Sequence, residues 1–555
     1  MKSPWINNYP EGVPAAISTD GYASLVDLLE QACKRFGPRT AVQSFGVCLT
    51  YKKLEEEAAS FAKWLQSLRL DAGARVALMM PNVLAYPVAL FGALKAGCVV
   101  VNVNPLCTPR ELGVQLRDSG ASVIVVFESV ADTLEQVTDC EGLLHRVVVS
   151  PGDMLGPLKS TVINFGARHI KKLGPKKPLV GAWPWRFVLR LGRDLSWQAP
   201  SISMDDLAAL QYTGGTTGLP RGAMLTHRNL VSNVLQVEAV AQPALGALLP
   251  RPLTMLTALP LYHVFAMTVC GLYAMHAGMK SVLVINPRDR ASLLHAWRKD
   301  PPHVFPGVNT LFNALLNEPQ FSTLDFSSLR LAFGGGMAIQ QAVAQRWVAV
   351  TGRPLIEGYG LSETSPVVTA NPTNASAYSG SIGLPLPSTD VCIVDEQGSP
   401  VATGERGEIA VRGPQVMQGY WNAATDTHNA MTPDGFFRTG DIGYIDDQGY
   451  VFLIDRKKDL IVVSGFNVYP SEVEAVVSSH PGVSECAAIG VPDDASGEAV
   501  KLFVVPADPL LNQAAVQEWC VRELSRYKCP RAIEFRNELP KSNVGKILRR
   551  ALREQ

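Results

Sequence analysis

One stretch of the chain has the composition of a polyphosphate-binding loop. Within residues 212–222, threonines and glycines alternate in one short run: Thr213, Gly214, Gly215, Thr216, Thr217 and Gly218. Glycines allow positive φ and close backbone approach, and hydroxyls beside backbone N–H groups suit phosphate oxygens. Arg221 adds a positive charge. The run fits neither the Walker A pattern nor the dinucleotide-binding pattern, and a flexible surface turn is the alternative interpretation.

Further blocks with chemistry-bearing residues follow in the chain, at residues 334–337, 358–366, 439–441, 455–459, 464–470 and 540–547. Each block alone reads as an ordinary turn or a solvated charged segment. Taken together and in this order, they resemble the adenylate-forming superfamily, which contains acyl-CoA synthetases, luciferases and peptide-synthetase adenylation domains. The resemblance spans most of residues 40–555. The blocks at 464–470 and 540–547 are most similar to those of bacterial long-chain fatty-acid–CoA ligases.

The resemblance implies an ATP site built from four of these blocks. It implies that the ring of Tyr359 lies against adenine and that Gly335 and Gly336 wall the adenine pocket. Asp441 would bind the ribose hydroxyls, with Arg456 as a second ribose contact. These residue types suit the roles, because a flat aromatic face fits a purine and a carboxylate accepts from both hydroxyls of a cis-diol.

The resemblance also implies a magnesium ion between protein and phosphates. Glu363 and Thr216 are its implied ligands, and a hard carboxylate oxygen suits Mg²⁺. The chain departs from the usual family pattern at two nearby positions. Ser362 stands where the family more often has threonine, which keeps the hydroxyl, and Arg221 stands where the family usually has lysine, which keeps the charge but changes its geometry.

The remaining implied site residues serve catalysis and CoA. Lys546 would carry the adenylation step, because a mobile lysine can meet both a carboxylate and the α-phosphate. Gly465 would face the pantetheine tunnel, Lys458 falls on the family's hinge position, and His263 would lie near the acyl pocket and tunnel. Singly, a lysine is more often a surface residue and a histidine more often a structural one.

Composition excludes several other classes of protein. The chain has 555 residues, 47% of them hydrophobic, and a formal net charge of zero, which argues against a nucleic-acid-binding protein. Its ten cysteines form no ligand-spaced cluster and read as buried or free thiols of a reducing compartment. The first residues lack the apolar core of a signal peptide, and the longest near-apolar run, 264–275, is shorter than the roughly 20 residues of a membrane span.

Strands alternate with helices through the first part of the chain and predict an α/β fold. A βαβ unit is expected from a strand at 75–80, a helix at 82–95 and a strand at 98–103, and alternation of this kind implies parallel sheets. The loop at 213–218 is expected at a strand-to-helix turn. We expect a large N-terminal domain, 1–456, with α/β subdomains to about 379 and a β subdomain at 380–456, followed by a small mobile α+β domain at 457–555.

Residues 159–193 break this pattern. They contain nine Lys or Arg residues and no Asp or Glu, and Trp183, Trp185, Phe187 and Leu189 stand among them. In an otherwise neutral chain this is typical of a membrane-surface element, with a solvated basic loop as the alternative. The sequence therefore predicts a cytoplasmic protein peripherally associated with the inner face of the cell membrane.

The expected activity is that of a long-chain fatty-acid–CoA ligase, which converts ATP, a fatty acid and CoA to acyl-CoA, AMP and diphosphate through an acyl-adenylate. The expected partners are those three substrates, Mg²⁺ and membrane lipid, with a homodimer left open and no nucleic acid. One alternative is an adenylating ligase that loads a carrier protein instead of CoA. The other is a lipid-binding peripheral protein without catalysis.

Overall fold

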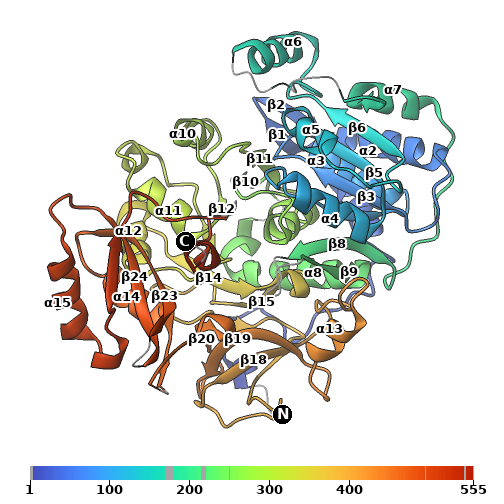
Figure 1. Ribbon diagram of the computed structural model, residues 1–555. Helices are drawn as coiled ribbons and strands as arrows, with labels where there is room; N and C mark the ends of the chain where they lie inside the picture. Colours follow the sequence, from blue (N-terminus) through green and yellow to red (C-terminus); the bar gives the residue numbers. More distant parts are fainter. Residues whose placement is uncertain are drawn as a thin grey trace.

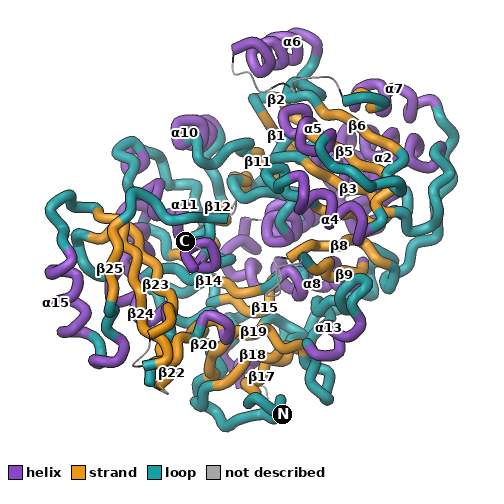
Figure 2. Tube along the Cα trace, in the orientation of Figure 1, coloured by secondary structure: helices purple, strands orange, loops and turns teal. Residues whose placement is uncertain are grey.

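The computed structural model of the chain describes residues 4–170, 174, 179–213, 220–248, 251–464, 466–493, 496–542 and 545–553. Two large sheets with helices against them form most of the molecule, a small antiparallel sheet follows, and a separate α+β unit ends the chain (Figures 1 and 2). The expected fold class, a large N-terminal domain with parallel sheets and a small C-terminal α+β domain, is confirmed. The boundary at residues 456 and 457 stays a prediction.

The first large sheet has the strand order β7-β6-β5-β3-β4-β8-β9 in the described part of the chain. Its strands are β3 (Arg75–Met79), β4 (Val99–Asn102), β5 (Ala121–Phe127), β6 (His145–Val149), β7 (Ala182–Pro184), β8 (Leu207–Thr213) and β9 (Arg221–Thr226). All neighbours are parallel except β8 and β9. The predicted βαβ unit is confirmed, because β3 and β4 are parallel neighbours joined by a helix.

The second large sheet has the order β16-β15-β14-β13-β12-β10-β11-β1-β2 over the described residues. Its strands are β1 (Thr40–Ser44), β2 (Val47–Thr50), β10 (Thr254–Thr257), β11 (Lys280–Leu283), β12 (Val304–Gly307), β13 (Leu331–Gly334), β14 (Leu355–Gly360), β15 (Val367–Ala370) and β16 (Leu384–Pro385). Strands β1 and β10 to β14 are parallel, and the antiparallel strands lie at both edges. The carboxyl ends of β13 and β14 therefore lie side by side.

Two smaller sheets complete the fold. The first is antiparallel and contains β17 (Asp390–Val394), β18 (Gly407–Arg412), β19 (Phe437–Ile445) and β20 (Val451–Arg456). The second belongs to the C-terminal unit and contains β21 (Ile461–Val463), β22 (Phe466–Val468), β23 (Val483–Asp493), β24 (Gly497–Pro506) and β25 (Ala532–Phe535). The short strands expected from residue 380 onward are confirmed.

The helices cover the sheets and connect their strands. The α-helices are α1 (Leu25–Phe36), α2 (Tyr51–Ser67), α3 (Ala85–Lys95), α4 (Pro109–Ser119), α5 (Ala131–Glu135), α6 (Pro157–Phe165), α7 (Trp185–Asp194), α8 (His227–Leu245), α9 (Ala274–His276), α10 (Arg290–Lys299), α11 (Asn309–Leu316), α12 (Gln341–Thr351), α13 (Ala424–Asn429), α14 (Pro470–Ser478), α15 (Gln513–Glu523) and α16 (Arg549–Arg553). Three other helical segments matter below, namely the π-helix η5 (Ala266–Tyr273) and the 3-10 turns η7 (Ser362–Thr364) and η8 (Lys457–Asp459). Within the described residues, no helix combines the length and apolarity needed to cross a bilayer.

Two helix starts follow directly from local sequence. The hydroxyl of Thr50 accepts a hydrogen bond from the backbone N–H of Lys53 and caps α2. Thr108 and Glu111 form a reciprocal capping box at α4, with Pro109 in its first turn. Both caps satisfy backbone N–H groups that have no partner inside the helix.

The expected position of the threonine–glycine loop was wrong in one respect. The loop does not join a strand to a helix, because β8 and β9 pair antiparallel on either side of it and α8 begins only after β9. Residues 214–219 themselves lie outside the described residues. The apolar run of β9 is short and adjoins the loop, so its sequence does not mark it as a strand. The two strands that flank residues 214–219 are therefore antiparallel neighbours, with β9 at the edge of the first large sheet.

Candidate active site

Three of the predicted residues meet at the junction of the second large sheet and the antiparallel sheet. The Tyr359 hydroxyl, at the end of β14, donates to Asp441 Oδ2 at 2.7 Å. Arg456 Nε lies 3.0 Å from Asp441 Oδ1, because Asp441 on β19 and Arg456 on β20 are cross-strand partners. Tyr359 and Asp441 are both buried. Burial, followed by the charge of Asp441, raises the pKa of the Tyr359 hydroxyl, which keeps it a donor.

Glu363 lies in η7, directly after this tyrosine strand, and is also buried. Its Oε1 accepts from the hydroxyl of Tyr420 at 2.9 Å. Burial raises the pKa of the Glu363 carboxyl, and the bond from Tyr420 opposes that shift. Ser362 is half-buried at the start of the same turn. The predicted carboxylate therefore has a hydrogen-bond partner that sequence reasoning missed.

Tyr420 also connects Glu363 to Arg221. The guanidinium of Arg221 lies over the Tyr420 ring, 5.5 Å from its centroid, and Arg221 Nε pairs with Asp426 Oδ2 at 2.9 Å. Arg221 faces Thr213 across the β8–β9 hairpin. Asp426 was not predicted either. The base of the phosphate-type loop and the Glu363 turn thus belong to one network of charged and aromatic groups.

Backbone hydrogen bonds hold the segment that carries Tyr420 against both β9 and η7. The segment before α13 runs beside β9, where Met224 N–H donates to Gly419 C=O at 2.9 Å and Trp421 N–H donates to Gly222 C=O at 2.8 Å. The same segment reaches η7, because Met417 N–H donates to Glu363 C=O at 2.8 Å. These contacts fix the position of Tyr420 relative to both β9 and Glu363.

The predicted glycines at the end of β13 lie beside Tyr359. A Cβ on Gly335 would come within 3.2 Å of Gly358 C=O and of the Phe265 ring, so a side chain there would be crowded. Gly336 has φ of 78°, a conformation that favours glycine. Gly214, Gly215, Thr216, Thr217 and Gly218, and also Gly465, lie outside the described residues.

Lys546 belongs to the C-terminal unit and lies near Arg456 and Asp441. Its loop docks on the second large sheet through Thr310 Oγ1 of α11, which donates to Gly545 C=O at 3.2 Å. Burial lowers the pKa of Lys546 to about 8, and Arg456 contributes to the decrease while Asp441 opposes it. His263 lies close enough that Lys546 adds to the effect of burial, which lowers the pKa of His263 to about 4. His263 is therefore neutral at pH 7.

The predicted hinge residue, Lys458, is exposed in η8, between β20 and the C-terminal unit. An ion cluster adjoins it. Arg549 of α16 pairs with Asp455 at 3.0 Å and Asp459 at 3.3 Å, and its other arm pairs with Glu474 of α14 at 2.7 Å. Asp455 Oδ2 also accepts from the backbone N–H of Ser471 at 2.6 Å. Asp455 thus holds the C-terminal unit in the orientation that brings Lys546 to Asp441.

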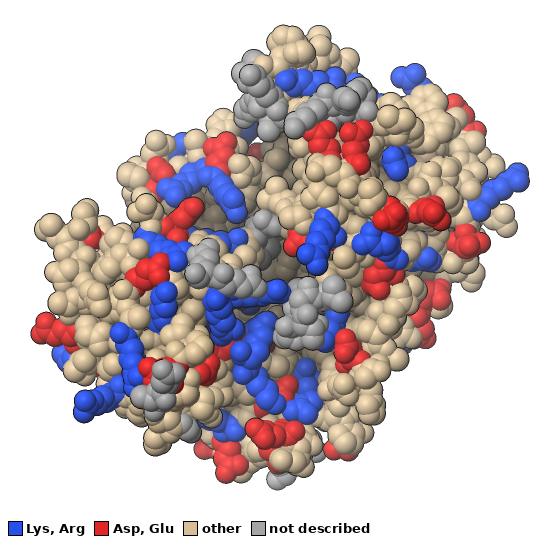
Figure 3. Space-filling view, viewed as in Figure 1, with Lys and Arg blue, Asp and Glu red and all other residues tan. Residues whose placement is uncertain are grey.

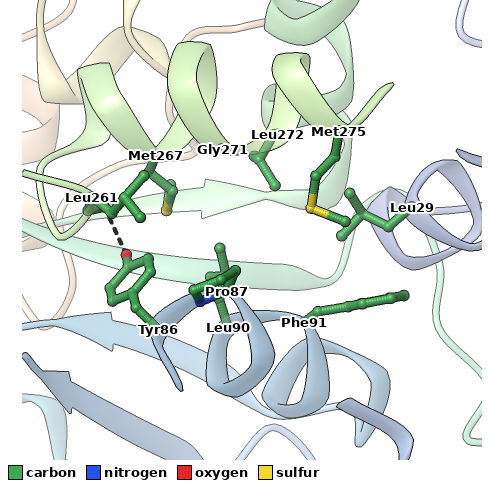
Figure 4. Close-up of a pocket in the computed structure, with 10 residues that line it drawn as sticks. All are labelled: Leu29, Tyr86, Pro87, Leu90, Phe91, Leu261, Met267, Gly271, Leu272 and Met275. Carbon is green, nitrogen blue, oxygen red and sulfur yellow. Dashed lines mark hydrogen bonds between the residues drawn. The ribbon is translucent and has the colours of Figure 1, made fainter. Parts of the chain in front are cut away.

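A small apolar cavity lies between α3 and the π-helix η5, in continuation of the segment that carries His263. Figure 4 shows Tyr86, Pro87, Leu90 and Phe91 of α3 on one side, and on the other Met267, Gly271 and Leu272 of η5 with Met275 of α9. The full lining is Leu29, Tyr86, Pro87, Leu90, Phe91, Leu261, Met267, Gly271, Leu272 and Met275. The volume is about 20 Å³. A π-helix is uncommon and is often found at functional sites.

The surface around the site is hollowed and basic. In the space-filling view a hollow runs between α10 and α4, and Lys and Arg side chains gather below it (Figure 3). Three described cations of the site, Arg221, Arg456 and Lys546, come from three different segments of the chain. Such a concentration of charge favours an anionic ligand.

Comparison with known proteins places this geometry in context. The AMP-binding enzyme family matches residues 29–421, and the AMP-binding enzyme C-terminal domain matches residues 472–546. The chain is 51% identical to a long-chain-fatty-acid–CoA ligase of Escherichia coli O157:H7, with 100% of this chain and 98% of that protein covered. The crystal structure of the anthranilate CoA ligase AuaEII with anthranoyl-AMP superposes with a TM-score of 0.84 at 26% identity, covering 96% of this chain and 97% of that one. ATP-bound MatB from Rhodopseudomonas palustris superposes with a TM-score of 0.77 at 27% identity, covering 95% and 98% of the two chains.

Proposed function

The chain belongs to the AMP-binding enzyme family, and on this premise we propose that it is a long-chain fatty-acid–CoA ligase. A carboxylate oxygen of the fatty acid attacks the α-phosphorus of ATP, and the bond to diphosphate breaks. The sulfur of CoA, having lost its proton, then attacks the acyl carbon of the acyl-AMP, and AMP leaves. The observation that carries the proposal is the meeting of Lys546 with Asp441 and Arg456, in a chain that matches such ligases over its full length.

The nucleotide is held by groups that the fold has already positioned. Asp441 would accept from the ribose hydroxyls, and Arg456 would donate to the ribose from the same side. The ring of Tyr359 and the backbone at Gly335 and Gly336 would border the adenine. These assignments are supported by the hydrogen bond and ion pair that fix the Asp441 carboxylate before any ligand arrives.

Magnesium fits the residues present. No group of three or more His, Cys, Asp or Glu side chains in the described part of the chain could hold a metal. Mg²⁺ in nucleotide enzymes commonly uses one or two carboxylates together with substrate phosphates, so the buried carboxylate of Glu363 would hold the ion. Thr216, which lies outside the described residues, would be a second ligand. When bound, the ion would neutralise charge on the phosphates during diphosphate loss.

Tyr420 should matter for this metal although it would not itself bind the ion. Because its hydroxyl bonds to Glu363 Oε1, we expect Tyr420→Phe to raise the Mg²⁺ concentration needed for half-maximal adenylation by about tenfold to a hundredfold, equivalent to the loss of one hydrogen bond to a charged group. The ring over Arg221 is kept in this variant. The measurement is Mg²⁺ dependence of diphosphate release, with Mn²⁺ binding followed by electron paramagnetic resonance in the presence of a non-hydrolysable ATP analogue.

Tyr444→Phe is the matched control, because Tyr444 stacks on Phe452 at 4.8 Å in the antiparallel sheet, away from Glu363. It should leave metal dependence unchanged. An unchanged metal requirement in Tyr420→Phe, with Mn²⁺ bound as in the wild type, would contradict the role given to the hydroxyl.

The acyl chain would enter the apolar region between α3 and η5. The cavity of about 20 Å³ holds no C16 chain as it stands, so side chains must move. Met267 and Met275 line it, and unbranched thioether side chains adapt easily. Each buried CH₂ contributes ~0.8 kcal/mol, which favours long acids over acetate or aromatic acids.

Filling this cavity should shorten the preferred substrate. A Cβ on Gly271 would meet its nearest atoms at 3.7 Å, so a side chain can start there without a clash. We expect Gly271→Leu to lower kcat/KM for a C16 acid about tenfold to a hundredfold relative to a C8 acid, the loss of two or three buried methylenes. Gly271→Ala is the control and should keep the wild-type ratio. An equal decrease for both acids would place the acyl chain elsewhere.

The second half-reaction needs CoA in place of Lys546. We propose that the small domain rotates about Lys458 and presents the loop with Gly465 to the pantetheine arm. A glycine leaves room for a thin ligand. The rotation would withdraw the Lys546 cation once the acyl-AMP has formed. It would also keep water away from the acyl-AMP.

The decisive test of the activity is fatty-acid-dependent release of diphosphate, followed by thioester formation with free CoA. A lipid-binding protein without catalysis would release no diphosphate. An enzyme that loads a carrier protein would release diphosphate but form no thioester with free CoA. We further propose a location at the inner face of the cell membrane, and the next inference specifies the surface involved.

A further inference from the structure

Helix α6 turns an apolar stripe outward. Leu158, Val162 and Phe165 follow one another at i, i+4 and i+7, and their exposed fractions are 84%, 71% and 60%. The helices of soluble proteins usually turn such a stripe toward the core. Here the only buried residue of the helix is the polar Ser160. The stripe therefore faces solvent along the whole helix.

A second outward apolar face lies next to it. On β7 and α7, the rings of Trp183 and Phe187 stack with centroids 5.5 Å apart, and Leu191 follows one turn later, also exposed. The opposite side of α7 is buried, and its Trp185 packs against Phe61 of α2 with ring centroids 5.0 Å apart. Arg186 of α7 donates to Gly152 C=O at 2.9 Å and to Ser160 Oγ of α6, which holds the two elements side by side. Both lie at the upper end of the molecule in Figure 1.

The net positive charge around residues 159–193 is smaller than the sequence of this stretch indicates. Carboxylates from outside residues 159–193 neutralise part of it, because Arg168 pairs with Glu128 at 2.7 Å, Arg186 with Asp153 at 2.8 Å and Arg193 with Glu57 at 2.8 Å. Lys171, Lys172, Lys176 and Lys177 lie outside the described residues. Lys159 and Arg190 are exposed beside the two apolar faces, and no salt bridge joins either to a described carboxylate.

We propose that the outward faces of α6 and of β7–α7 form a lipid-docking surface that enters the headgroup region of an anionic bilayer. Apolar side chains supply most of the attachment, and Lys159 and Arg190 add attraction to anionic headgroups. Indole and phenyl rings at the edge of such a surface suit the membrane interface, which is apolar on one side and wet on the other. The inference rests on the proposed function, since a long-chain acid dissolved in the bilayer would reach the enzyme there.

The test is co-sedimentation of the full-length protein with vesicles of phosphatidylcholine and phosphatidylglycerol. Leu158→Glu with Val162→Glu should weaken binding at least tenfold, because two charges would enter the headgroup region. Leu510→Glu is the matched control, since Leu510 is also 84% exposed but lies in the small domain, and it should bind as the wild type does. Equal binding of the double variant and the control would overturn the proposal.

Salt distinguishes apolar docking from simple charge attraction. Wild-type binding should fall less than tenfold between about 0.1 M and about 0.5 M NaCl, because screening affects only the ionic part. Complete loss in salt would overturn the apolar docking surface. Quenching of tryptophan fluorescence by brominated lipid should decrease in Trp183→Phe, and unchanged quenching would count against the placement of β7.

Two further readouts separate lipid docking from a dimer interface and from a loss of catalysis. If the wild type were a dimer by size-exclusion chromatography and the double variant a monomer, the faces would join two copies of the chain and the lipid proposal would fail. With fatty acid supplied in detergent, the double variant should keep wild-type turnover. If the wild type showed no turnover, the ligase function would be refuted. The lipid-docking proposal would still be decided by the vesicle-binding measurements alone.

Discussion

Lys546→Ala will slow fatty-acid-dependent diphosphate release by about 10²- to 10³-fold, the usual loss when one positioned group that stabilises transition-state charge is removed. The same variant should convert supplied acyl-AMP and CoA to acyl-CoA at nearly the wild-type rate. The reason is geometric, because Lys546 lies beside Asp441 and Arg456 in the present orientation and would be withdrawn for the second half-reaction. Single-turnover measurements of each half-reaction give both rates.

The pH profile provides an independent readout. Only the protonated ammonium can neutralise the carboxylate and the α-phosphate, and burial has lowered the pKa of Lys546 to about 8. Deprotonation therefore removes the active form as pH rises, and kcat/KM for adenylation, which reports the free enzyme, should fall above pH about 8. Lys546→Arg should remove this alkaline decrease, because guanidinium stays charged.

Lys541→Ala serves as the control from the same loop. Lys541 pairs with Glu485 at 2.6 Å within the small domain and has no part in the site. It should leave both half-reactions and the pH profile unchanged. If Lys546→Ala slowed both half-reactions equally, Lys546 would be a structural residue and the alternation of domain orientations would be refuted.

Asp441→Asn should reduce kcat/KM for ATP by about 10²- to 10³-fold. A carboxylate hydrogen bond to each ribose hydroxyl is worth roughly 1.5–3 kcal/mol, and an amide would keep only part of that. The substitution also leaves the buried Tyr359 hydroxyl and the Arg456 guanidinium without their carboxylate partner. The loss should appear in KM for ATP, with KM for the fatty acid little changed.

Loss of a buried ion pair by itself must be separated from loss of ribose binding. Asp153→Asn provides that comparison, because Asp153 pairs with Arg186 at 2.8 Å and its side chain is 7% exposed, against 2% for Asp441. It should lower the melting temperature without changing KM for ATP. A normal KM for ATP in Asp441→Asn would remove Asp441 from the nucleotide site.

The site residues that sequence predicted share a local signature. Tyr359, Glu363, Asp441 and Lys546 stand in or beside glycine-containing turns at strand ends or in loops, where motif spacing is conspicuous. Their convergence was implied only by resemblance, because Tyr359 and Asp441 are 82 positions apart and no local pattern reveals such a contact. The fold class could also be predicted from the sequence, because alternating strands and helices leave few arrangements other than parallel sheets.

What sequence missed depends on contacts between distant segments. Tyr420 is 57 positions from Glu363 and sits in a turn with no spacing that would mark it, and Asp426 is an ordinary acidic residue of a short helix. The charge of residues 159–193 was misjudged because its neutralising carboxylates, Glu57, Glu128 and Asp153, come from outside the stretch. The antiparallel pairing of β9 was missed because six residues after a loop carry too little periodicity.

The ion cluster at Arg549 has a consequence for the order in which substrates react. Should the small domain turn about Lys458, Ser471 and Glu474 would travel with Arg549, whereas Asp455 would stay on β20. Within this ion cluster, the turn would then break only the contacts of Asp455, and Arg549 would keep Glu474 as a counter-ion. Before substrates bind, the small domain would accordingly stay in the orientation in which Lys546 faces the site for ATP and the fatty acid. CoA would be excluded until diphosphate has gone, so an ordered kinetic scheme would follow from one arginine that gives up Asp455 and keeps Glu474.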